Sequence, residues 1–247
     1  MRLTQEQKRF YSDEGYVAIE DVASPASVRA MRERVEELCA AWDSEEARRL
    51  GMQQEAGVSG ALTDRETAAT VRKFSGLVDH EPVFAAHATN DSLLDLVEDI
   101  IGAPMCLYAD QALLKPPRVG SEKMPHQDNA YFKVDPSDAV VTAWCALDEA
   151  TVENGCMHYV AGSHRAGAVG HAGVAGTPHL VPKGFERAAT VPVPIPAGGV
   201  IFHHAECMHF TPMNVTDTWR RAFVCHYVRA DARMPDKDPA TLRAVRG

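Results

Sequence analysis

The sequence predicts an antiparallel β-sandwich or jelly roll flanked by helices, and three observations support this fold class. The first third of the chain has mainly helical patterning, and the part after about residue 103 consists of short apolar runs separated by Pro and Gly turns. Strands also do not alternate with helices along the chain, as they do in a doubly wound parallel sheet. No Gly-x-Gly-x-x-Gly or P-loop string favours such a sheet.

The N-terminal part has three local signals. Residues 4–13 predict a short helix, and residues 15–22 (GYVAIEDV) predict a strand because β-branched residues alternate with others. Ser24 followed by Pro25 predicts the start of a second helix, since Ser caps helices and Pro tolerates the first helical position. The apolar residues of this helix recur at helical spacing and predict one packed stripe: Val28, Met31, Val35 and Leu38.

The next part of the chain predicts a loop followed by another helix. Residues 41–70 are polar and weakly periodic, so we expect an excursion or lid and not a core element. A helix is expected from a cap at Asn90 or Ser92 to a stop at Gly102, because apolar residues recur between them at helical spacing.

Strands dominate the rest of the chain. Six apolar or alternating runs predict them, at residues 105–114, 139–147, 156–160, 190–195, 199–204 and 220–228. Asn154-Gly155 lies between two apolar runs and predicts a β-hairpin. Residues 165–187 are rich in Gly, Ala and Pro, which predicts a mobile loop near the mouth of a barrel, and the polar tail after Arg229 is expected to be peripheral.

Composition predicts one compact domain over residues 1–247. We expect a helical part at about 1–103, a jelly-roll core at about 104–229 and a peripheral tail at 230–247. The chain is 45% hydrophobic and 24% charged, and its formal charge of -9 argues against nucleic acid or an anionic membrane as a partner. It has no apolar run long enough for a membrane span and no signal-peptide core, so we expect a cytoplasmic protein. Six cysteines without a Cys-x-x-Cys pair are expected to be mostly buried and reduced.

One short string indicates a metal site. In His126-Gln127-Asp128, residues i and i+2 of a strand point to the same face and could offer an imidazole and a carboxylate to one ion. The pair alone is a weak signal, but a second histidine on a late strand could complete a two-histidine, one-carboxylate site that leaves Fe(II) open positions. His203, His204 and His209 compete for that role, and spacing does not choose among them.

Two arginines follow in the run that begins WRRAFVCHY. An arginine inside an apolar barrel is costly unless it meets an anion, and its planar fork matches a carboxylate. Iron plus an inward Arg220 or Arg221 is the combination that a dicarboxylic keto acid needs. Alternatively, both arginines lie at the solvated end of the strand.

Taken together, these strings resemble the phytanoyl-CoA dioxygenase family of Fe(II)- and 2-oxoglutarate-dependent oxygenases. The matching pieces cover most of residues 5–229: GYVAIEDV, LLKPPRVGSEKMPHQD, WCALDEATVENGCMHYVAGSHR and GGVIFHHAECMHFTPMNVTDTWRRAFVCHY. Their joint occurrence is far more specific than the His-x-Asp pair alone. The resemblance implies a double-stranded β-helix, that is, a jelly-roll or cupin-like core.

The resemblance also implies roles for particular residues. The family's distal ligand precedes a polar turn containing Asn, which selects His209 beside His126 and Asp128 as metal ligands. The arginine that binds 2-oxoglutarate matches Arg220, with Arg221 as the alternative. Four further positions match residues that contact this cosubstrate in other members: Thr211, Trp144, Lys73 and Tyr108. Core packing of Trp144 and Tyr108, and a solvated position for Lys73, are the alternatives.

The implied activity is oxidation of a small molecule with Fe(II), 2-oxoglutarate and O2, releasing succinate and CO2. Related halogenases lack the carboxylate ligand, so Asp128 favours hydroxylation, or else desaturation, epoxidation, cyclisation or epimerisation. A small metabolite or natural-product intermediate of secondary metabolism is expected as substrate, because no compact basic cluster for the phosphates of an acyl-CoA is evident. The alternatives are an acyl-CoA hydroxylase, a zinc hydrolase and a non-catalytic cupin-like binding protein. The walls of the substrate site are expected from residues 41–70 and 165–187, and the oligomeric state is left open.

Overall fold

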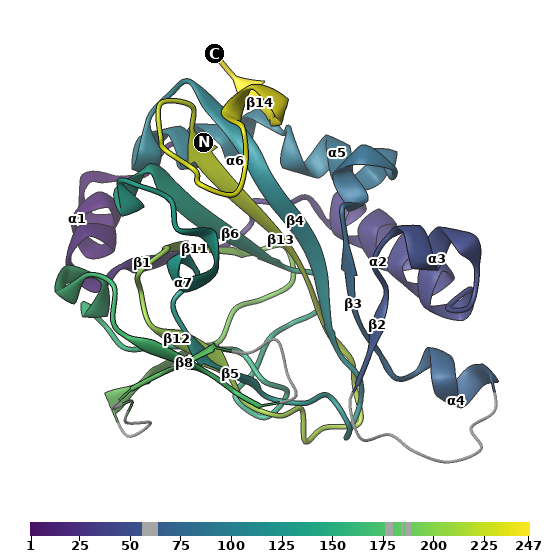
Figure 1. Ribbon diagram of the computed structural model, residues 1–247. Coiled ribbons are helices and arrows are strands. Elements are labelled where there is room, and N and C mark those ends of the chain that lie inside the picture. The colour runs from purple at the N-terminus through teal and green to yellow at the C-terminus, as the bar shows by residue number, and fades with distance from the viewer. Residues whose placement is uncertain (56–63, 176–179, 184, 186–188) are drawn as a thin grey trace.

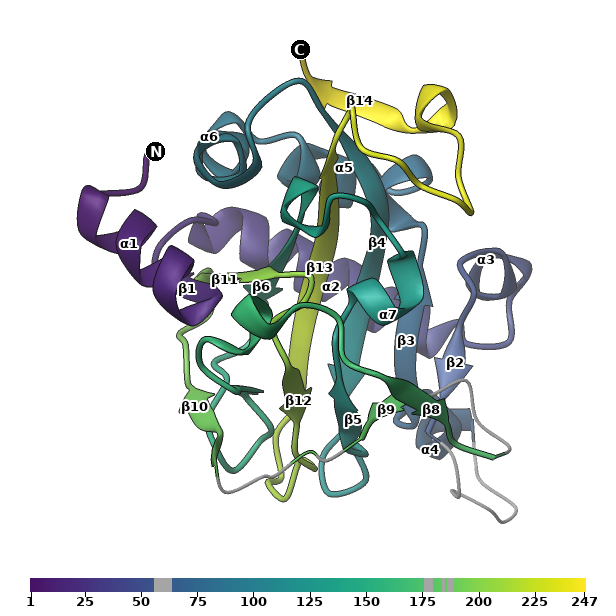
Figure 2. The same ribbon diagram turned by 60° about the vertical axis from the view of Figure 1, so that its left-hand side comes forward.

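The computed structural model describes residues 1–55, 64–175, 180–183, 185 and 189–247. Two antiparallel sheets face each other across an interior space (Figures 1 and 2). In the described residues the larger sheet runs in the order β1 (Tyr16–Ile19), β11 (Val200–His204), β6 (Val140–Ala146), β13 (Arg220–Arg229), β4 (Met105–Lys115), β3 (Val71–Ser75) and β2 (Gln53–Gln54), with β14 (Arg243–Arg246) also paired to β4. The smaller sheet runs β10 (Val191–Val193), β7 (Met157–Tyr159), β12 (His209–Thr211) and β5 (Lys123–His126). The predicted mainly-β jelly roll with flanking helices is confirmed.

Helices cover the outer face of the larger sheet, with α2, α5 and α6 packed against it (Figure 1). The described α-helices are α1 (Gln5–Glu14), α2 (Pro25–Ala40), α3 (Glu45–Arg49), α4 (Asp64–Ala68), α5 (Pro82–Ala88), α6 (Asp91–Ile101) and α7 (Asn129–Phe132). Short 3-10 turns lie at Leu77–Asp79, Ser137–Ala139, Ser163–Ala166 and Pro239–Thr241. None of these helices is long and apolar enough to cross a membrane.

Side-chain caps fix the helix starts as the sequence predicts. The Ser24 hydroxyl accepts a hydrogen bond from the Ser27 amide, with Pro25 as the first helical residue. The Asn90 side chain caps α6, and Gly102 ends it. The predicted starts of these two helices are therefore confirmed.

Alternation along the central strand β13 separates the helix-covered face from the interior. Phe223, Cys225 and Tyr227 belong to the core under the helices, where the Phe223 ring lies 4.7 Å from that of Phe84. Arg220 and His226 have the opposite parity and line a cavity between the two sheets. The interior of the jelly roll therefore receives every second side chain of this strand.

The predicted hairpin at Asn154-Gly155 is wrong. Strand β6 pairs with β11 and β13 in the larger sheet, whereas β7 pairs with β10 and β12 in the smaller one. The turn instead carries the chain from one sheet to the other, because both edges of β6 are already occupied. Asn154 stabilises this crossing, accepting from the Thr151 amide at 2.8 Å and donating to the Glu149 carbonyl at 2.8 Å.

Two segments expected to be loops carry regular structure. Residues 41–70 contain α3, β2 and α4, with Ala47 and Leu50 fully buried, although 56–63 lie outside the described residues. The stretch 165–187 contains a small hairpin of β8 (His171–Gly173) and β9 (Leu180–Pro182), and 176–179, 184 and 186–188 lie outside the described residues. The C-terminal tail, expected to be peripheral, contains β14, which pairs with β4, and the Arg246 guanidinium donates to Asp95 at 2.7 Å. All six cysteines are free and buried.

Candidate metal centre and its cavity

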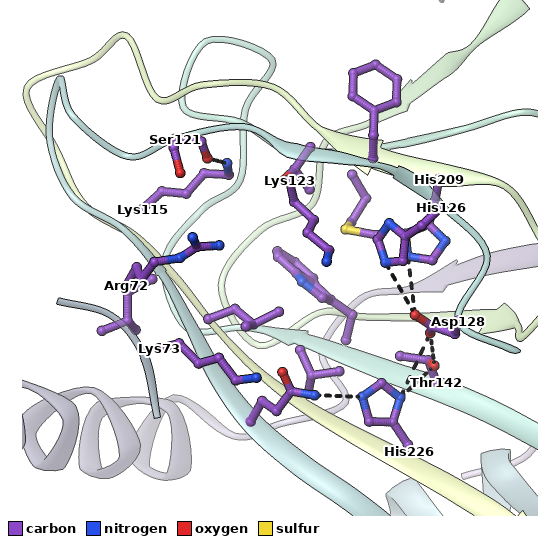
Figure 3. A pocket seen from close by; sticks show the side chains of 18 of the residues that line it. Arg72, Lys73, Lys115, Ser121, Lys123, His126, Asp128, Thr142, His209 and His226 are labelled. Carbon is purple, nitrogen blue, oxygen red and sulfur yellow. Dashed lines mark hydrogen bonds and ion pairs between the residues drawn. The ribbon is translucent and has the colours of Figure 1, made fainter. Parts of the chain in front are cut away.

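A cavity of about 380 Å³ lies between the two sheets and is lined by side chains of both. Its volume falls in the range of small-molecule sites. Figure 3 shows His126, Asp128 and His209 gathered on one side of it and Arg72 and Lys115 on the other.

The structure brings His126, Asp128 and His209 together. His126 ends β5 and is the cross-strand partner of His209 at the start of β12, which places their ring centroids 4.3 Å apart. One carboxylate oxygen of Asp128 lies 3.4 Å from Nε2 of His126 and 3.7 Å from Nε2 of His209. One potential ligand atom from each of the three residues lies within 4.8 Å of the others, which is the spacing of a metal site.

The His-x-Asp pair does not adopt the geometry expected for it. Strand β5 ends at His126, and Asp128 has helical backbone angles at the start of α7. Gln127 between them points away from the cavity and is almost fully buried, donating to the carbonyls of Gly167 at 3.0 Å and Glu206 at 2.8 Å. The turn, and not a continuous strand, directs both ligand side chains to the same space.

Backbone contacts leave the same nitrogen free on both histidines. Nδ1 of His126 donates to the Met124 carbonyl at 2.8 Å, and Nδ1 of His209 donates to the Cys207 carbonyl at 2.9 Å. Each Nε2 then carries a lone pair directed at the cavity, as a metal ligand requires. Burial lowers the pKa of both imidazoles, so both are neutral near pH 7.

Two side chains hydrogen-bond to the Asp128 carboxylate, and one of them, His203, also packs 4.4 Å from the His209 ring. The second oxygen of Asp128 accepts from the Thr142 hydroxyl at 2.6 Å and from Nε2 of His203 at 3.1 Å. Tyr159 donates in turn to Nδ1 of His203 at 2.8 Å. Burial alone raises the pKa of Asp128, but the neighbouring histidines outweigh it and hold that pKa well below its ordinary value. The carboxylate is therefore ionised and oriented.

The three competing histidines of the sequence have three different positions. His209 faces His126 and Asp128, and His203 hydrogen-bonds to Asp128 from β11 of the larger sheet. His204 has the opposite parity on β11, and its Nδ1 accepts from the Glu206 amide at 3.0 Å. Sequence reasoning did not identify Thr142 or His203 as supports, although Thr142 shares its strand face with Trp144.

Arg220 and Arg221 likewise face opposite ways. Arg220 lines the cavity with 3% of its surface exposed, and its Nε is buried without a hydrogen-bond partner. Its guanidinium lies over the Trp144 ring at 5.4 Å, and burial lowers its pKa to about 10. Arg221 bonds to both oxygens of Asp148, at 2.7 and 2.9 Å, and also to Glu36. Arg220 is thus available to an anion, whereas carboxylates already occupy Arg221.

Of the four further residues matched to cosubstrate contacts, three line the cavity and one does not. Thr211, Trp144 and Lys73 line the cavity, but Tyr108 is not among its lining residues. The register of β13 against β4 shifts between His226 and Tyr227, so Tyr108 has no partner across the strands. Its ring packs instead 4.8 Å from Phe132 and under the Lys237 ammonium at 4.1 Å.

The fold also gathers a basic cluster that the sequence did not reveal. Arg72, Lys73, Lys115 and Lys123 line the same cavity as Arg220. They come from β3, β4 and β5, so the expectation that no compact basic cluster exists is wrong. Arg72 and Lys73 are neighbours in the sequence, but Lys115 and Lys123 lie about 40 and 50 residues later, and only the fold brings the three strands together around one cavity.

The comparisons agree with this geometry. The family model described as phytanoyl-CoA dioxygenase (PhyH) matches residues 11–222. A probable phytanoyl-CoA dioxygenase of Caenorhabditis elegans is 29% identical over 93% of this chain and 76% of its own length. The peroxisomal phytanoyl-CoA dioxygenase of Homo sapiens is 27% identical over 95% of this chain and 71% of its own length.

A solved structure shares the fold. The non-heme alpha ketoglutarate dependent carbocyclase SnoK from nogalamycin biosynthesis superposes with a TM-score of 0.70 and 27% identity, covering 94% of this chain and 86% of SnoK. The family match includes strands of both sheets and every residue of the His126, Asp128 and His209 cluster. The chain therefore belongs to the phytanoyl-CoA dioxygenase family of Fe(II)- and 2-oxoglutarate-dependent oxygenases.

Proposed function

We propose that His126, Asp128 and His209 bind Fe(II) and that Arg220 binds the distal carboxylate of 2-oxoglutarate. The observation that carries this proposal is one cavity that holds both a buried ligand triad and a buried arginine whose Nε has no partner. A zinc hydrolase also uses two histidines and a carboxylate, but its chemistry does not explain why Arg220 is buried in the same cavity.

The residues present fit both groups. Both free Nε2 atoms and one Asp128 oxygen face the same space, and three ligands on one face leave adjacent positions open. Bound iron and 2-oxoglutarate supply the oxidising chemistry, consuming O2 and releasing succinate and CO2. Arg220 orients the keto acid through its fork, while Thr211, Trp144 and Lys73 line the cavity around it. The chain itself contributes position, charge and exclusion of water.

We propose hydroxylation of a small metabolite or natural-product intermediate as the reaction. Asp128 retains the third ligand position, and the SnoK enzyme that shares the fold acts in nogalamycin biosynthesis. Acyl-CoA hydroxylation is the second candidate, which the names of the worm and human relatives favour. That the chain forms a single domain and that the protein is cytoplasmic remain predictions from the sequence.

Two measurements test the proposal. An anaerobic titration of Fe(II)-loaded protein with 2-oxoglutarate should produce a visible charge-transfer band in the wild type and a weaker one in Asp128→Ala and Arg220→Ala. In air, the protein should then release succinate from 2-oxoglutarate when given small-molecule extracts or acyl-CoA esters. A product 16 Da heavier indicates insertion of one oxygen atom, as in hydroxylation or epoxidation, and one 2 Da lighter indicates loss of two hydrogen atoms, as in desaturation or cyclisation. Tight zinc binding without any affinity for 2-oxoglutarate would refute the proposal.

A further inference from the structure

The cavity has more basic side chains than binding of the keto acid accounts for. Among the described residues, its lining has five basic side chains (Arg72, Lys73, Lys115, Lys123 and Arg220) and two carboxylates (Glu55 and Asp128). Burial holds the pKa of Lys115 well below its ordinary value, and the four other basic side chains still outnumber the carboxylates. Fe(II) and the 2-oxoglutarate dianion cancel each other in charge. With both bound, the cavity therefore still carries an excess of positive charge, which is costly in a partly buried site unless an anion compensates it.

Two cations of this group, Arg72 and Lys123, are not assigned to the keto acid, and the Lys123 ammonium lies 5.2 Å from the centre of the Tyr131 ring. Arg220 is assigned to the keto acid, Lys73 is expected beside it, and the Lys115 ammonium donates to the Ser121 carbonyl. Glu55 is occupied as well, accepting from the amide and the hydroxyl of Ser121. Within the described part of the chain, neither Arg72 nor Lys123 forms an ion pair with a carboxylate.

Arg72 and Lys123 come from opposite walls of the cavity. Arg72 lies on β3 of the larger sheet and Lys123 on β5 of the smaller one. Figure 3 shows both side chains extending into the space between them, with the metal ligands beyond Lys123. Burial lowers the pKa of Lys123 to about 8; the charge of Asp128 opposes this shift, and the charges of Arg72 and Lys73 add to it.

We propose that Arg72 and Lys123 form a subsite for a carboxylate or phosphate group of the substrate, which identifies the substrate as an anionic small molecule. This inference rests on the proposed function. A planar guanidinium and a compact ammonium on opposite walls can contact the same oxyanion from two sides. The group that they hold would lie in the same cavity as the metal ligands, so the subsite would orient the substrate for oxidation.

The test uses protein loaded anaerobically with Fe(II) and saturated with 2-oxoglutarate, so that Arg220 is occupied. Phenylacetate, phenyl phosphate and the uncharged phenylacetamide serve as probes in calorimetric titrations. We expect the two anions to bind at least about tenfold more tightly than the amide, and their affinity to fall as salt increases. The tighter of the two anions distinguishes a carboxylate from a phosphate site.

Variants assign the binding to the subsite. Arg72→Met and Lys123→Met each remove one charged contact and should weaken the anionic probes about 10- to 100-fold, with little change for 2-oxoglutarate. Arg72→Lys keeps the charge and should restore part of the affinity. Lys133→Met is the matched control, because Lys133 is exposed and pairs with Asp236 at 3.4 Å outside the cavity.

Two results would overturn the inference. Equal binding of the amide and the anions would show that charge does not select the ligand. Loss of 2-oxoglutarate affinity in Arg72→Met and Lys123→Met, with the probes unaffected, would assign both cations to the cosubstrate. If wild-type protein fails to bind 2-oxoglutarate, the proposed function fails, and comparison of Arg72→Met and Lys123→Met with the wild type in the same probe titrations still decides the subsite.

Discussion

Replacing Arg220 by Met should weaken 2-oxoglutarate binding and stabilise the protein without ligand. Arg220 is 3% exposed, its Nε has no partner, and its one protein hydrogen bond in the described residues is a 3.4 Å contact to the Leu113 carbonyl. Burial lowers its pKa to about 10 from an ordinary value near 12.5, which corresponds to a cost of about 3 kcal/mol. Because the folded state holds this proton less tightly than the unfolded chain, the whole cost is present below pH 10.

Replacement of Arg220 by Met should stabilise the folded protein and weaken the binding of 2-oxoglutarate. Met fills much of the same space, and the lost contact with Trp144 removes about 1 kcal/mol of the gain. The ligand-free variant should therefore be about 2 kcal/mol more stable, and its melting temperature should rise by about 4–8 °C. Loss of a buried, bidentate carboxylate contact costs about 2–5 kcal/mol of binding, so the Kd for 2-oxoglutarate should rise at least about 30-fold.

Differential scanning calorimetry of the ligand-free protein and anaerobic titration of the Fe(II)-loaded protein measure the two effects. Arg221→Met is the control, because Arg221 is already paired with Asp148 and Glu36. That variant should lose stability and keep its affinity for 2-oxoglutarate. A less stable Arg220→Met protein with unchanged affinity would show that the arginine is structural and would refute the reasoning.

Three further predictions concern the ligands and their surroundings. Asp128→Ala should abolish tight Fe(II) binding, whereas His204→Gln should retain it, because His204 lies on the opposite face of β11. Competition with a chromophoric chelator measures the Fe(II) affinity of both variants. Thr142→Val removes the 2.6 Å bond that orients Asp128 and should lower metal affinity about 10- to 100-fold, and Thr142→Ser should restore it in the same assay. Burial lowers the pKa of His87 to about 4, so the unfolded chain binds this proton first as the pH falls from 6.5. Unfolding in urea should therefore show wild-type stability declining between pH 6.5 and 4.5, with a decline about 2 kcal/mol smaller in His87→Gln, and equal declines would contradict the assignment.

The sequence by itself determined the features that depend on local patterning. The caps at Ser24 and Asn90 are recognisable because helix starts are satisfied by side chains a few residues away. The apolar runs between turns indicated the mainly-β fold, since strand formation follows from alternation and length. The family resemblance also selected His209 and Arg220, which spacing alone left open.

The tertiary structure decided everything that depends on pairing between distant strands. The register of β12 on β5 brings His209 beside His126, and strand parity directs Arg220 inward and Arg221 outward. The same kind of pairing removed the expected hairpin at Asn154-Gly155, because β6 already had a partner on each edge. A one-residue shift reverses every side chain of a strand, and composition carries no record of register. The basic cluster around Arg72 and Lys123 became visible for this reason only once the two sheets were assembled.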